Sequence, residues 1–317
     1  MERLLHEPKP GVAQLGFGHA EGEQQVVLPL VLQMECTATA DETERNMTAT
    51  IARGYTPLME HFERYSGTLS LCGSGPSLAA KLHELTGDVL ACNGAIGFLL
   101  DRGIVPRHAM LWDAAPIVAE FAVPHPDITY FVASRCHPSV FERLAGCKVV
   151  VWHAGGDHNV DDFLSDRKIH EPMLQGGTTA VTRGMYLAFA LGYKDLHLFG
   201  ADSCYTDGAT HVEGASKVPE GLVNVMVGGR WFKSTCQWAA QIEEIKIIYP
   251  MMMQPEVGAR ITAHDEGMMA WVISIMDRDM RKALLEAKAT CELQTQKNGQ
   301  AVPGAPGVAT QPLEETQ

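Results

Sequence analysis

The segment TLSLCGSGPSL at residues 68–78 decides the fold. It joins a short apolar strand to a glycine-rich turn, and the AAKLHEL that follows at 79–85 has the apolar spacing of a helix. A strand, a glycine-rich turn and a helix in this order commonly bind phosphate, because glycine lets the backbone approach a ligand and the first amides of a helix have no partner within it. The segment therefore predicts a phosphate site at the end of a strand.

The alternation of apolar runs with amphipathic stretches continues along the chain. Strands are predicted at 68–73, 89–93, 108–113, 128–133, 148–153, 196–201 and 260–263. Helices are predicted at 77–86, 94–103, 115–122, 138–145, 178–192 and 235–249. Most of the strand runs are continuously apolar, which is typical of parallel strands covered by helices on both faces. The expected fold class is therefore α/β, with a doubly wound, mostly parallel, Rossmann-like sheet.

The chain divides into four predicted parts. Residues 1–66 form an N-terminal helical or irregular region, with one or two helices in its second half, and residues 67–270 form the Rossmann-like nucleotide-binding domain. A long C-terminal helix is predicted at 268–293, of which 271–293 lies beyond the domain. Residues 294–317 have hardly any large apolar side chain, so we expect a disordered tail.

The composition excludes several classes of protein. A net charge of −13 argues against binding to nucleic acid, whose backbone is held mainly by Lys and Arg. No apolar run approaches the roughly 20 residues of a membrane-spanning helix, and the first residues lack the apolar stretch of a signal peptide. We therefore expect a cytoplasmic protein with no nucleic-acid or membrane partner. The cysteines include no CxxC pair and are expected to be reduced core residues, among them Cys72, Cys92, Cys136, Cys147 and Cys204.

Two common phosphate-binding motifs do not match the glycine-rich turn. A Walker A loop requires a Lys after its last glycine, and none is present here. The dinucleotide fingerprint fits at Gly73 and Gly75, but Leu78 occupies its third glycine position and Asn93 stands where an acidic residue is expected. NAD is thus disfavoured. A plain tight turn between strand and helix is the alternative to a phosphate site.

Four segments occur in the order and at about the spacing of a known family. They are GSGPSLAAKLHEL (73–85), ACNGAIGFLLDRGIVPRHAMLWDA (91–114), GGTTAVTRGMYLAFALGYKDLHLFGADSCY (176–205) and GARITAHDEG (258–267). Over roughly residues 65 to 270 the chain resembles the MptE-like domain, a family similar to archaeal 6-hydroxymethylpterin diphosphokinases and to flagellin-modifying motility accessory factors. Its turn, the Asn after the second strand and the Thr-rich helix start also resemble bacterial sialyltransferases that use CMP-sugars.

This resemblance implies roles for two glycine-rich segments. The nucleotide phosphates would be wrapped by Gly73, Ser74, Gly75, Pro76, Ser77 and Leu78, and the ribose or base would meet Asn93. The second segment contains Gly176, Gly177, Thr178 and Thr179 at the start of the 178–192 helix. Thr178 is expected to cap this helix while nearby amides face the crevice; an ordinary capped helix is the alternative.

Three further residues are candidates for catalysis. Asp113 and Asp202 follow predicted strands, so both could share a Mg²⁺ ion with the phosphates of a nucleotide. A helix cap or a loop ion pair is the alternative for each. The resemblance to sialyltransferases implies that His211 acts as a general base on the acceptor hydroxyl, whereas a surface histidine is the plain alternative.

Two other groups of side chains carry weaker signals. The segment HAGGDHNVDD at 153–162 is expected to form a solvated flap, because its spacing matches no helical pair of metal ligands. Its alternative is a metal cluster of His153, Asp157, His158, Asp161 and Asp162. One ring among Trp112, Trp152, Trp231 and Trp238 could stack on a base or sugar, but core packing is the default for these side chains.

The leading hypothesis is a nucleotide-dependent transferase with a small-molecule or glycan acceptor, and a homo-oligomer is compatible with the sequence. Mg²⁺-assisted transfer of diphosphate from ATP comes first. Transfer of a sugar from a CMP-sugar is the alternative, and a non-catalytic binding module on the same fold is a third hypothesis. Dependence of nucleotide binding on metal separates the first two.

Overall fold

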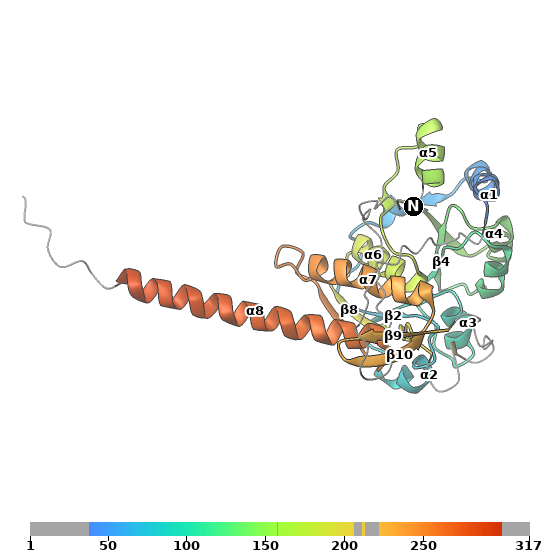
Figure 1. Cartoon of the computed structure of the whole chain (residues 1–317). Coiled ribbons are helices and arrows are strands. Elements are labelled where there is room, and N and C mark those ends of the chain that lie inside the picture. Colours follow the sequence, from blue (N-terminus) through green and yellow to red (C-terminus); the bar gives the residue numbers. More distant parts are fainter. Residues whose placement is uncertain (1–37, 157, 206–210, 213–221, 300–317) are drawn as a thin grey trace, which may run out of the picture. The chain divides into compact units, whose positions relative to one another are not determined.

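The computed structural model describes residues 38–299 except 157, 206–210 and 213–221. The chain divides into two compact units, Met1–Ile275 and Met276–Gln317, and the first contains every described strand (Figure 1). The domain boundaries expected at residues 66 and 270 remain predictions.

A nine-stranded sheet forms the centre of the first unit. Its order is β1-β6-β5-β4-β3-β2-β8-β11, with β7 beside β6, and all its pairings are parallel. All seven predicted strands are present: β2 (Thr68–Cys72), β3 (Asp88–Cys92), β4 (His108–Leu111), β5 (Thr129–Ala133), β6 (Lys148–Ala154), β8 (Asp195–Phe199) and β11 (Arg260–Ala263). The additional strands β1 (Thr56–Pro57) and β7 (Met173–Leu174) are too short to show a periodic pattern.

The order of the strands reverses at β2. The chain runs from β2 through β3, β4 and β5 to β6, and it then returns across the sheet to place β8 on the other side of β2. Cys72 at the end of β2 pairs with Phe199 at the end of β8. In open α/β sheets, ligands bind at such a reversal, outside the carboxyl ends of the strands. The glycine-rich turn begins directly after Cys72 and therefore lies at this point.

Helices cover both faces of the sheet. On one face lie α2 (Leu78–Lys81), α3 (Ala95–Leu100) and α4 (Pro138–Arg143), which connect strands in one direction. The helix α6 (Ala180–Leu191) connects β7 to β8 in the opposite direction and packs on β2, β3 and β4. Because such crossovers are right-handed, α6 lies on the opposite face. The doubly wound α/β fold predicted from the sequence is confirmed.

Several predicted helices differ in length or type. The 77–86 helix is α2 followed by a 3-10 turn, η2 (Leu82–Glu84), and the 115–122 helix is entirely 3-10, η3 (Pro116–Phe121). Pro116 begins η3 and Pro124 follows it, so the two prolines confine this helix to a short segment. The 235–249 helix is α7 (Cys236–Met252), which continues through Pro250.

Most of the segment 153–162 is regular structure rather than a solvated flap, and its described residues do not form a metal cluster. His153 belongs to β6 and is fully buried, and α5 (His158–Asp166) begins shortly after it. Apolar residues of α5, including Phe163, pack on Met47 and so give this segment a core of its own. Asp157 lies outside the described residues.

In the described part of the N-terminal region, one α-helix precedes β1 and one 3-10 turn follows it. α1 (Ala40–Ala52) begins with a capping box in which Thr39 and Glu42 satisfy each other's backbone amides, and η1 spans Leu58–His61. The buried Asn46 donates to the carbonyl oxygens of Ala114 (3.1 Å) and Arg135 (3.0 Å), which ties α1 to the loops after β4 and β5. Residues 1–37 lie outside the described part of the chain.

The C-terminal helix is longer than predicted. α8 runs from Met268 to Gly299, so the expectation of disorder is wrong for residues 294–299. These residues contain no Gly or Pro before Gly299, and nothing in them stops a helix that is already formed. The rest of the predicted tail, 300–317, lies outside the described residues.

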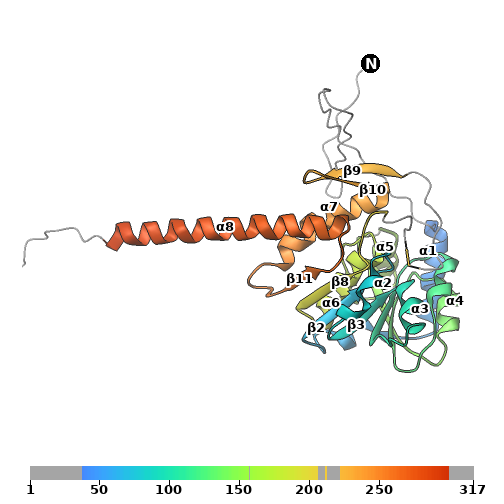
Figure 2. The same cartoon turned by 90° about the horizontal axis from the view of Figure 1, so that it is seen from below.

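A hairpin that the sequence analysis missed lies beside α7 (Figure 2). Its strands, β9 (Val223–Val227) and β10 (Arg230–Ser234), are antiparallel, and both Gly228 and Gly229 between them have positive φ. Two glycines between alternating runs are a recognised hairpin signal. Trp231 on β10 is 49% exposed, so the default of core packing is wrong for this tryptophan.

Four of the five cysteines predicted to lie in the core are buried there, whereas Cys147 is only partly buried. Six of the eight lie in the described residues as free thiols, and four of these are buried: Cys72, Cys92, Cys136 and Cys204. Among the described helices, none combines the length and the apolar composition that crossing a bilayer requires.

Candidate active site

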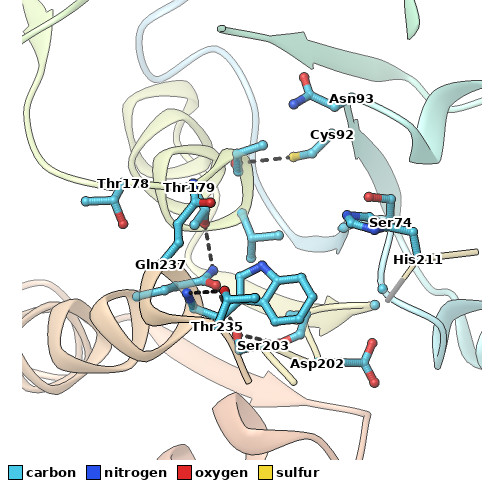
Figure 3. Close-up of a pocket in the computed structure, with 18 of the residues that line it drawn as sticks. Ser74, Cys92, Asn93, Thr178, Thr179, Asp202, Ser203, His211, Thr235 and Gln237 are labelled. Atoms are coloured by element: carbon cyan, nitrogen blue, oxygen red, sulfur yellow. Dashed lines mark hydrogen bonds between the residues drawn. The ribbon is translucent and has the colours of Figure 1, made fainter. Parts of the chain in front are cut away.

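A cavity of about 400 Å³ opens where the strand order reverses, at the carboxyl ends of β2, β3, β4 and β8. This volume is in the range of small-molecule sites. Nine of the predicted catalytic, nucleotide-binding and metal-binding residues line it: Gly73, Ser74, Gly75, Asn93, Asp113, Thr178, Thr179, Asp202 and His211. Figure 3 labels six of them around the cavity, together with Thr235 and Gln237 at the start of α7. The fold therefore brings together segments that are up to 138 residues apart in sequence, from Gly73 to His211.

The glycine-rich turn is fastened to the end of β8. The amide of Gly73 donates to Phe199 O and that of Gly75 donates to Gly200 O, each at 2.8 Å. A Cβ atom at residue 73 would lie 2.5 Å from Gly200 O, and one at residue 75 would collide with the carboxylate of Asp202. These two glycines are thus needed for close packing of the turn, and their amides already have partners within the chain.

Asp202 holds the other half of the turn. Its Oδ2 accepts hydrogen bonds from Ser77 N (3.3 Å) and Ser77 Oγ (2.9 Å). Burial raises the pKa of Asp202, and the two bonds from Ser77 oppose this rise. Leu78 is fully buried beneath the turn. Neither Pro76, Ser77 nor Leu78 lines the cavity.

A second carboxylate lies behind Asp202. Asp265 is 8% exposed, and its Oδ1 accepts a bond from Gly267 N at 2.9 Å. Burial and, less strongly, the charge of Asp202 raise the pKa of Asp265 to about 7. Met268 N donates to Asp202 O at 2.8 Å, so the segment after β11 fixes the backbone of Asp202.

Asn93 lines the cavity, and its side-chain oxygen is buried and unsatisfied. It follows β3 with a φ of 46°, a left-handed conformation that Asn tolerates better than most residues. Its backbone amide donates to Met110 O at 3.0 Å, whereas its side-chain Oδ1 is buried without a hydrogen-bond partner in the described residues. A buried acceptor without a partner is costly, and a donor on a ligand would satisfy it.

The start of α6 differs from the prediction. The helix begins at Ala180 and is capped by Thr179, whose side chain accepts from Thr182 N. Thr178, the predicted cap, instead donates through both N and Oγ to Glu244 at 2.8 Å. The sequence around Thr178 does not predict this pairing, because Glu244 is 66 residues away in sequence.

The two glycines before α6 serve the backbone rather than the cavity. Gly176 and Gly177 have φ values of 73° and 84°, and neither lines the cavity. A Cβ atom at residue 177 would lie 2.6 Å from Arg183 N. Glycine is therefore required here for a tight left-handed approach to α6.

The wall formed by α7 was missed by the sequence analysis. Thr235 caps α7 by accepting from Trp238 N at 3.2 Å. Gln241 spans the cavity: its Nε2 donates to Thr179 Oγ1 (2.6 Å), and its Oε1 accepts from Ser203 Oγ (3.0 Å). The STCQW sequence carries a recognisable helix-capping signal at Thr235, but nothing in it locates the helix beside the cavity.

His211 is held over the glycine-rich turn. The next residue, Val212, donates from its backbone N to Ser74 O at 2.9 Å. The His211 ring packs edge-on against Trp238, with 6.1 Å between the ring centroids. Burial lowers the pKa of His211, which favours the neutral imidazole at neutral pH.

The carboxylates at the cavity do not form a metal centre by themselves. In the described part of the chain, no group of three or more His, Cys, Asp and Glu side chains is placed to hold a metal ion. Asp113 Oδ1 accepts from Ala115 N at 3.2 Å, and Asp202 Oδ2 is bonded to Ser77. A Mg²⁺ ion here would therefore depend on oxygen atoms of a ligand for most of its coordination.

Comparison with solved structures shows the same fold in a larger protein. The MAf glycosyltransferase from Magnetospirillum magneticum AMB-1 aligns with a TM-score of 0.54 and 19% identity over 74% of this chain, which spans only 38% of that protein. The monofunctional α-2,3-sialyltransferase Cst-I from Campylobacter jejuni aligns with a TM-score of 0.36 and 16% identity, over 64% of this chain and 78% of the other. No curated protein sequence matches the chain.

A family match covers the segments that build most of the cavity. Residues 45–208 match the family described as 6-hydroxymethylpterin diphosphokinase MptE-like. This range contains the glycine-rich turn, Asn93, Asp113, the start of α6 and Asp202, and it ends before His211 and α7. The match supports a transferase-like function at the coarsest level. Extending over more than half of the sequence, it establishes that the chain belongs to the MptE-like family.

Proposed function

We propose that the protein is a transferase that binds a nucleotide donor in the cavity at the carboxyl ends of β2 and β8. The observation that carries this proposal is the buried, unpartnered Oδ1 of Asn93 in a polar cavity beside a glycine-rich turn. A ribose hydroxyl or an exocyclic amine of a base would supply the missing donor. The position at the reversal of strand order supports the same assignment.

The phosphate of the donor would be bound by helix starts rather than by the amides of Gly73 and Gly75. Both α6 and α7 begin at the cavity wall. Their first-turn amides, at 180–181 and 236–237, donate no hydrogen bond to the described residues. Two helix N-termini directed at one cavity favour an anionic group there.

The charge of the cavity favours a donor with few phosphates. Its described lining contains Asp113 and Asp202 but no Lys or Arg. A nucleoside monophosphate sugar brings one negative phosphate to this site, whereas ATP brings three and needs cations to neutralise them. We therefore rank a nucleotide-sugar donor, such as a CMP-sugar, above ATP.

Diphosphate transfer from ATP is the second candidate. It is favoured by the description of the family and by the presence of both Asp113 and Asp202 in the cavity lining. A bound Mg²⁺ would neutralise the phosphates in this case. The chain's own contribution would be to offer the side-chain oxygens of these two residues to the metal and to hold the nucleotide through Asn93.

His211 is the best-placed general base for either reaction. Its ring lies over the glycine-rich turn, and burial lowers its pKa so that the imidazole is neutral and able to accept a proton. An acceptor hydroxyl bound between His211 and the donor would lose its proton to the ring as it attacks. This role of His211 as a general base requires no further charged side chain in the cavity.

Calorimetric titration of CMP, a CMP-sugar and ATP, each with Mg²⁺ and with chelator, tests the proposal. We expect CMP to bind in the presence of chelator, with an affinity that Mg²⁺ does not change. If only ATP binds, and only with Mg²⁺, the second candidate replaces the first; Asp113→Asn and Asp202→Asn should then lose the metal-dependent gain, while Asp127→Asn, an exposed control, should keep it. Failure of every nucleotide to bind would leave the non-catalytic module as the better account.

A further inference from the structure

Glu244 is a carboxylate that the proposed chemistry does not use. It lies on α7 and projects to the start of α6, where its Oε2 accepts three hydrogen bonds. The donors are Thr178 N (2.8 Å), Thr178 Oγ1 (2.8 Å) and Thr182 Oγ1 (3.2 Å). A single carboxylate oxygen with three donors from one helix start is firmly placed.

The place it occupies is the positive end of α6. Thr178 and Thr179 precede the first helical residue, and aligned peptide dipoles give a helix start a partial positive charge. This is also where an anionic part of a ligand would be attracted. Glu244 therefore supplies an internal anion to a helix that opens on the cavity.

Glu244 itself stands behind the cavity wall. Thr178 and Thr179 line the cavity, whereas Glu244 does not. The pKa of Tyr186 is raised mainly by burial and then by the charge of Glu244, while the charge of Arg183 lowers it. Only Thr178 would stand between a ligand in the cavity and the carboxylate of Glu244. In a partly buried site, a unit charge this near changes the affinity for a charged ligand measurably.

The charges of the cavity lining add to this effect, while the buried guanidinium groups of Arg135 and Arg183 stand behind the lining residue Trp112, at 5.7 and 5.1 Å from its ring. The described lining adds two more carboxylates, Asp113 and Asp202, and no Lys or Arg. On α7 itself, the ammonium group of Lys246 is paired with Glu243 at 2.6 Å rather than with Glu244. Each further negative charge on a ligand would thus meet repulsion that no neighbouring side chain of the described lining offsets.

We propose that Glu244 is a specificity-determining residue, whose carboxylate at the start of α6 selects donors with a single phosphate by disfavouring each additional one. This inference rests on the proposed binding of a nucleotide in the cavity. It adds to the proposed function by assigning the preference for a donor with a single phosphate to one residue. Discrimination by repulsion of the wrong ligand is a general route to specificity.

The test compares phosphate series rather than single ligands. Affinities of CMP, CDP and CTP, of AMP, ADP and ATP, and of inorganic pyrophosphate are measured in chelator for the wild type and for Glu244→Gln. Gln keeps an acceptor for Thr178 and removes the charge. The ratio of CDP to CMP affinity should rise about five- to tenfold, as expected for loss of one unit charge at moderate dielectric.

The neighbouring residue gives a matched control. Glu243 carries the same charge on the same helix and is partly exposed, with its side chain paired to Lys246. Glu243→Gln should change the CDP to CMP ratio less than about twofold, because solvent screens an exposed charge. An equal change in both variants would overturn the proposal in favour of a general effect of net charge.

A second variant keeps the test decisive if Glu244→Gln does not fold. Gln241→Glu places a carboxylate in the cavity lining and should lower the same ratio. If the wild type binds CMP and the ratio is unchanged in the variants, the role of Glu244 is wrong while the nucleotide site stands. If the wild type binds no nucleotide but Glu244→Gln gains pyrophosphate, the role of Glu244 is supported and the native nucleotide site is wrong. If nothing binds to either protein, both are wrong.

Discussion

The two ends of the parallel sheet bury similar polar side chains but use them differently. At the amino ends of the strands, Arg107, Asp88, Tyr193 and His108 form one continuous chain: Arg107 donates to both oxygens of Asp88, Tyr193 OH bonds Asp88 at 2.5 Å, and His108 Nε2 lies 2.9 Å from Tyr193 OH. The ring of Tyr65 stacks on Tyr193 and closes this cluster. These groups satisfy one another except for His108 Nδ1, which is buried without a partner in the described residues.

At the carboxyl ends the polar groups surround a cavity instead. Asn93 Oδ1 has no partner in the described residues, and hydroxyl and amide side chains on α6 and α7 face the same space. The difference shows that burial of polar groups alone does not identify a functional site. What distinguishes the site is an unsatisfied group next to empty volume, at the end of the sheet where the strand order reverses.

The largest effect should come from Asp265, a buried carboxylate at the carboxyl end that does not line the cavity. In the folded protein, the pKa of Asp265 is raised to about 7. The protonated carboxyl keeps its full contribution to the stability of the folded state below pH 4. This contribution is lost as the pH rises through 7, because the buried group must then ionise. Asp265→Asn removes this loss and should stabilise the protein at pH 8 by on the order of 3 kcal/mol. Urea unfolding at pH 4.5 and pH 8 measures the difference.

Stabilisation by Asp265→Asn would show that a buried, unpaired carboxylate lowers the stability of the protein at the carboxyl ends of the strands. At the amino ends, the carboxylate of Asp88 avoids this cost because it is paired with Arg107. Asp127→Asn, at an exposed site, should give no such dependence on pH. A variant Asp265→Asn that is less stable than wild type at pH 8 would contradict the expectation.

A smaller effect is expected at the amino end. Tyr193→Phe removes the hydroxyl that bonds Asp88 and His108, leaving both with one bond fewer in a buried cluster. The free energy of unfolding should fall by about 2 kcal/mol, while nucleotide affinity of the folded protein should not change. Chemical denaturation and titration calorimetry give the two quantities. A loss of affinity without loss of stability would break the distinction between the two ends.

The smallest effect on stability is expected for Asn93→Gly. Glycine accepts the φ of 46° at this position, so the unfolding free energy should change by less than about 1 kcal/mol. Loss of the side-chain amide should nevertheless weaken binding of CMP about tenfold, because the ligand loses a buried partner. If Asn93→Gly instead lowered the free energy of unfolding and left the affinity for CMP unchanged, Asn93 would have a structural role and no role in binding.

Much of the sheet could be predicted because its strands are continuous apolar runs. All seven predicted strands lie within two residues of the observed bounds at each end. The 3-10 form of η3 and the presence of a helix at α5 were not predicted, because short segments are decided by tertiary packing rather than by periodicity. The packing of α5 on Met47 is an example, since the two are more than 100 residues apart in sequence.

The candidate site was predictable only in part. The glycine-rich turn, Asn93 and Asp202 were found because their strands end at the same edge of the sheet. Gln241 and Glu244 were not, because their contacts with Thr179 and Thr178 join residues more than 60 positions apart. No local pattern in α7 records that it will pack against α6.

The order of the strands also bears on how the chain acquires its shape during synthesis. β2 lies in the middle of the sheet and pairs with β8, so an edge of β2 stays open until residues 195–199 have left the ribosome. The cavity is completed later still, when Thr235 and Gln241 are added. Contacts between such distant residues slow folding. A growing chain that has reached residue 208 would already carry the glycine-rich turn and Asn93, but it would present them on an unfinished surface.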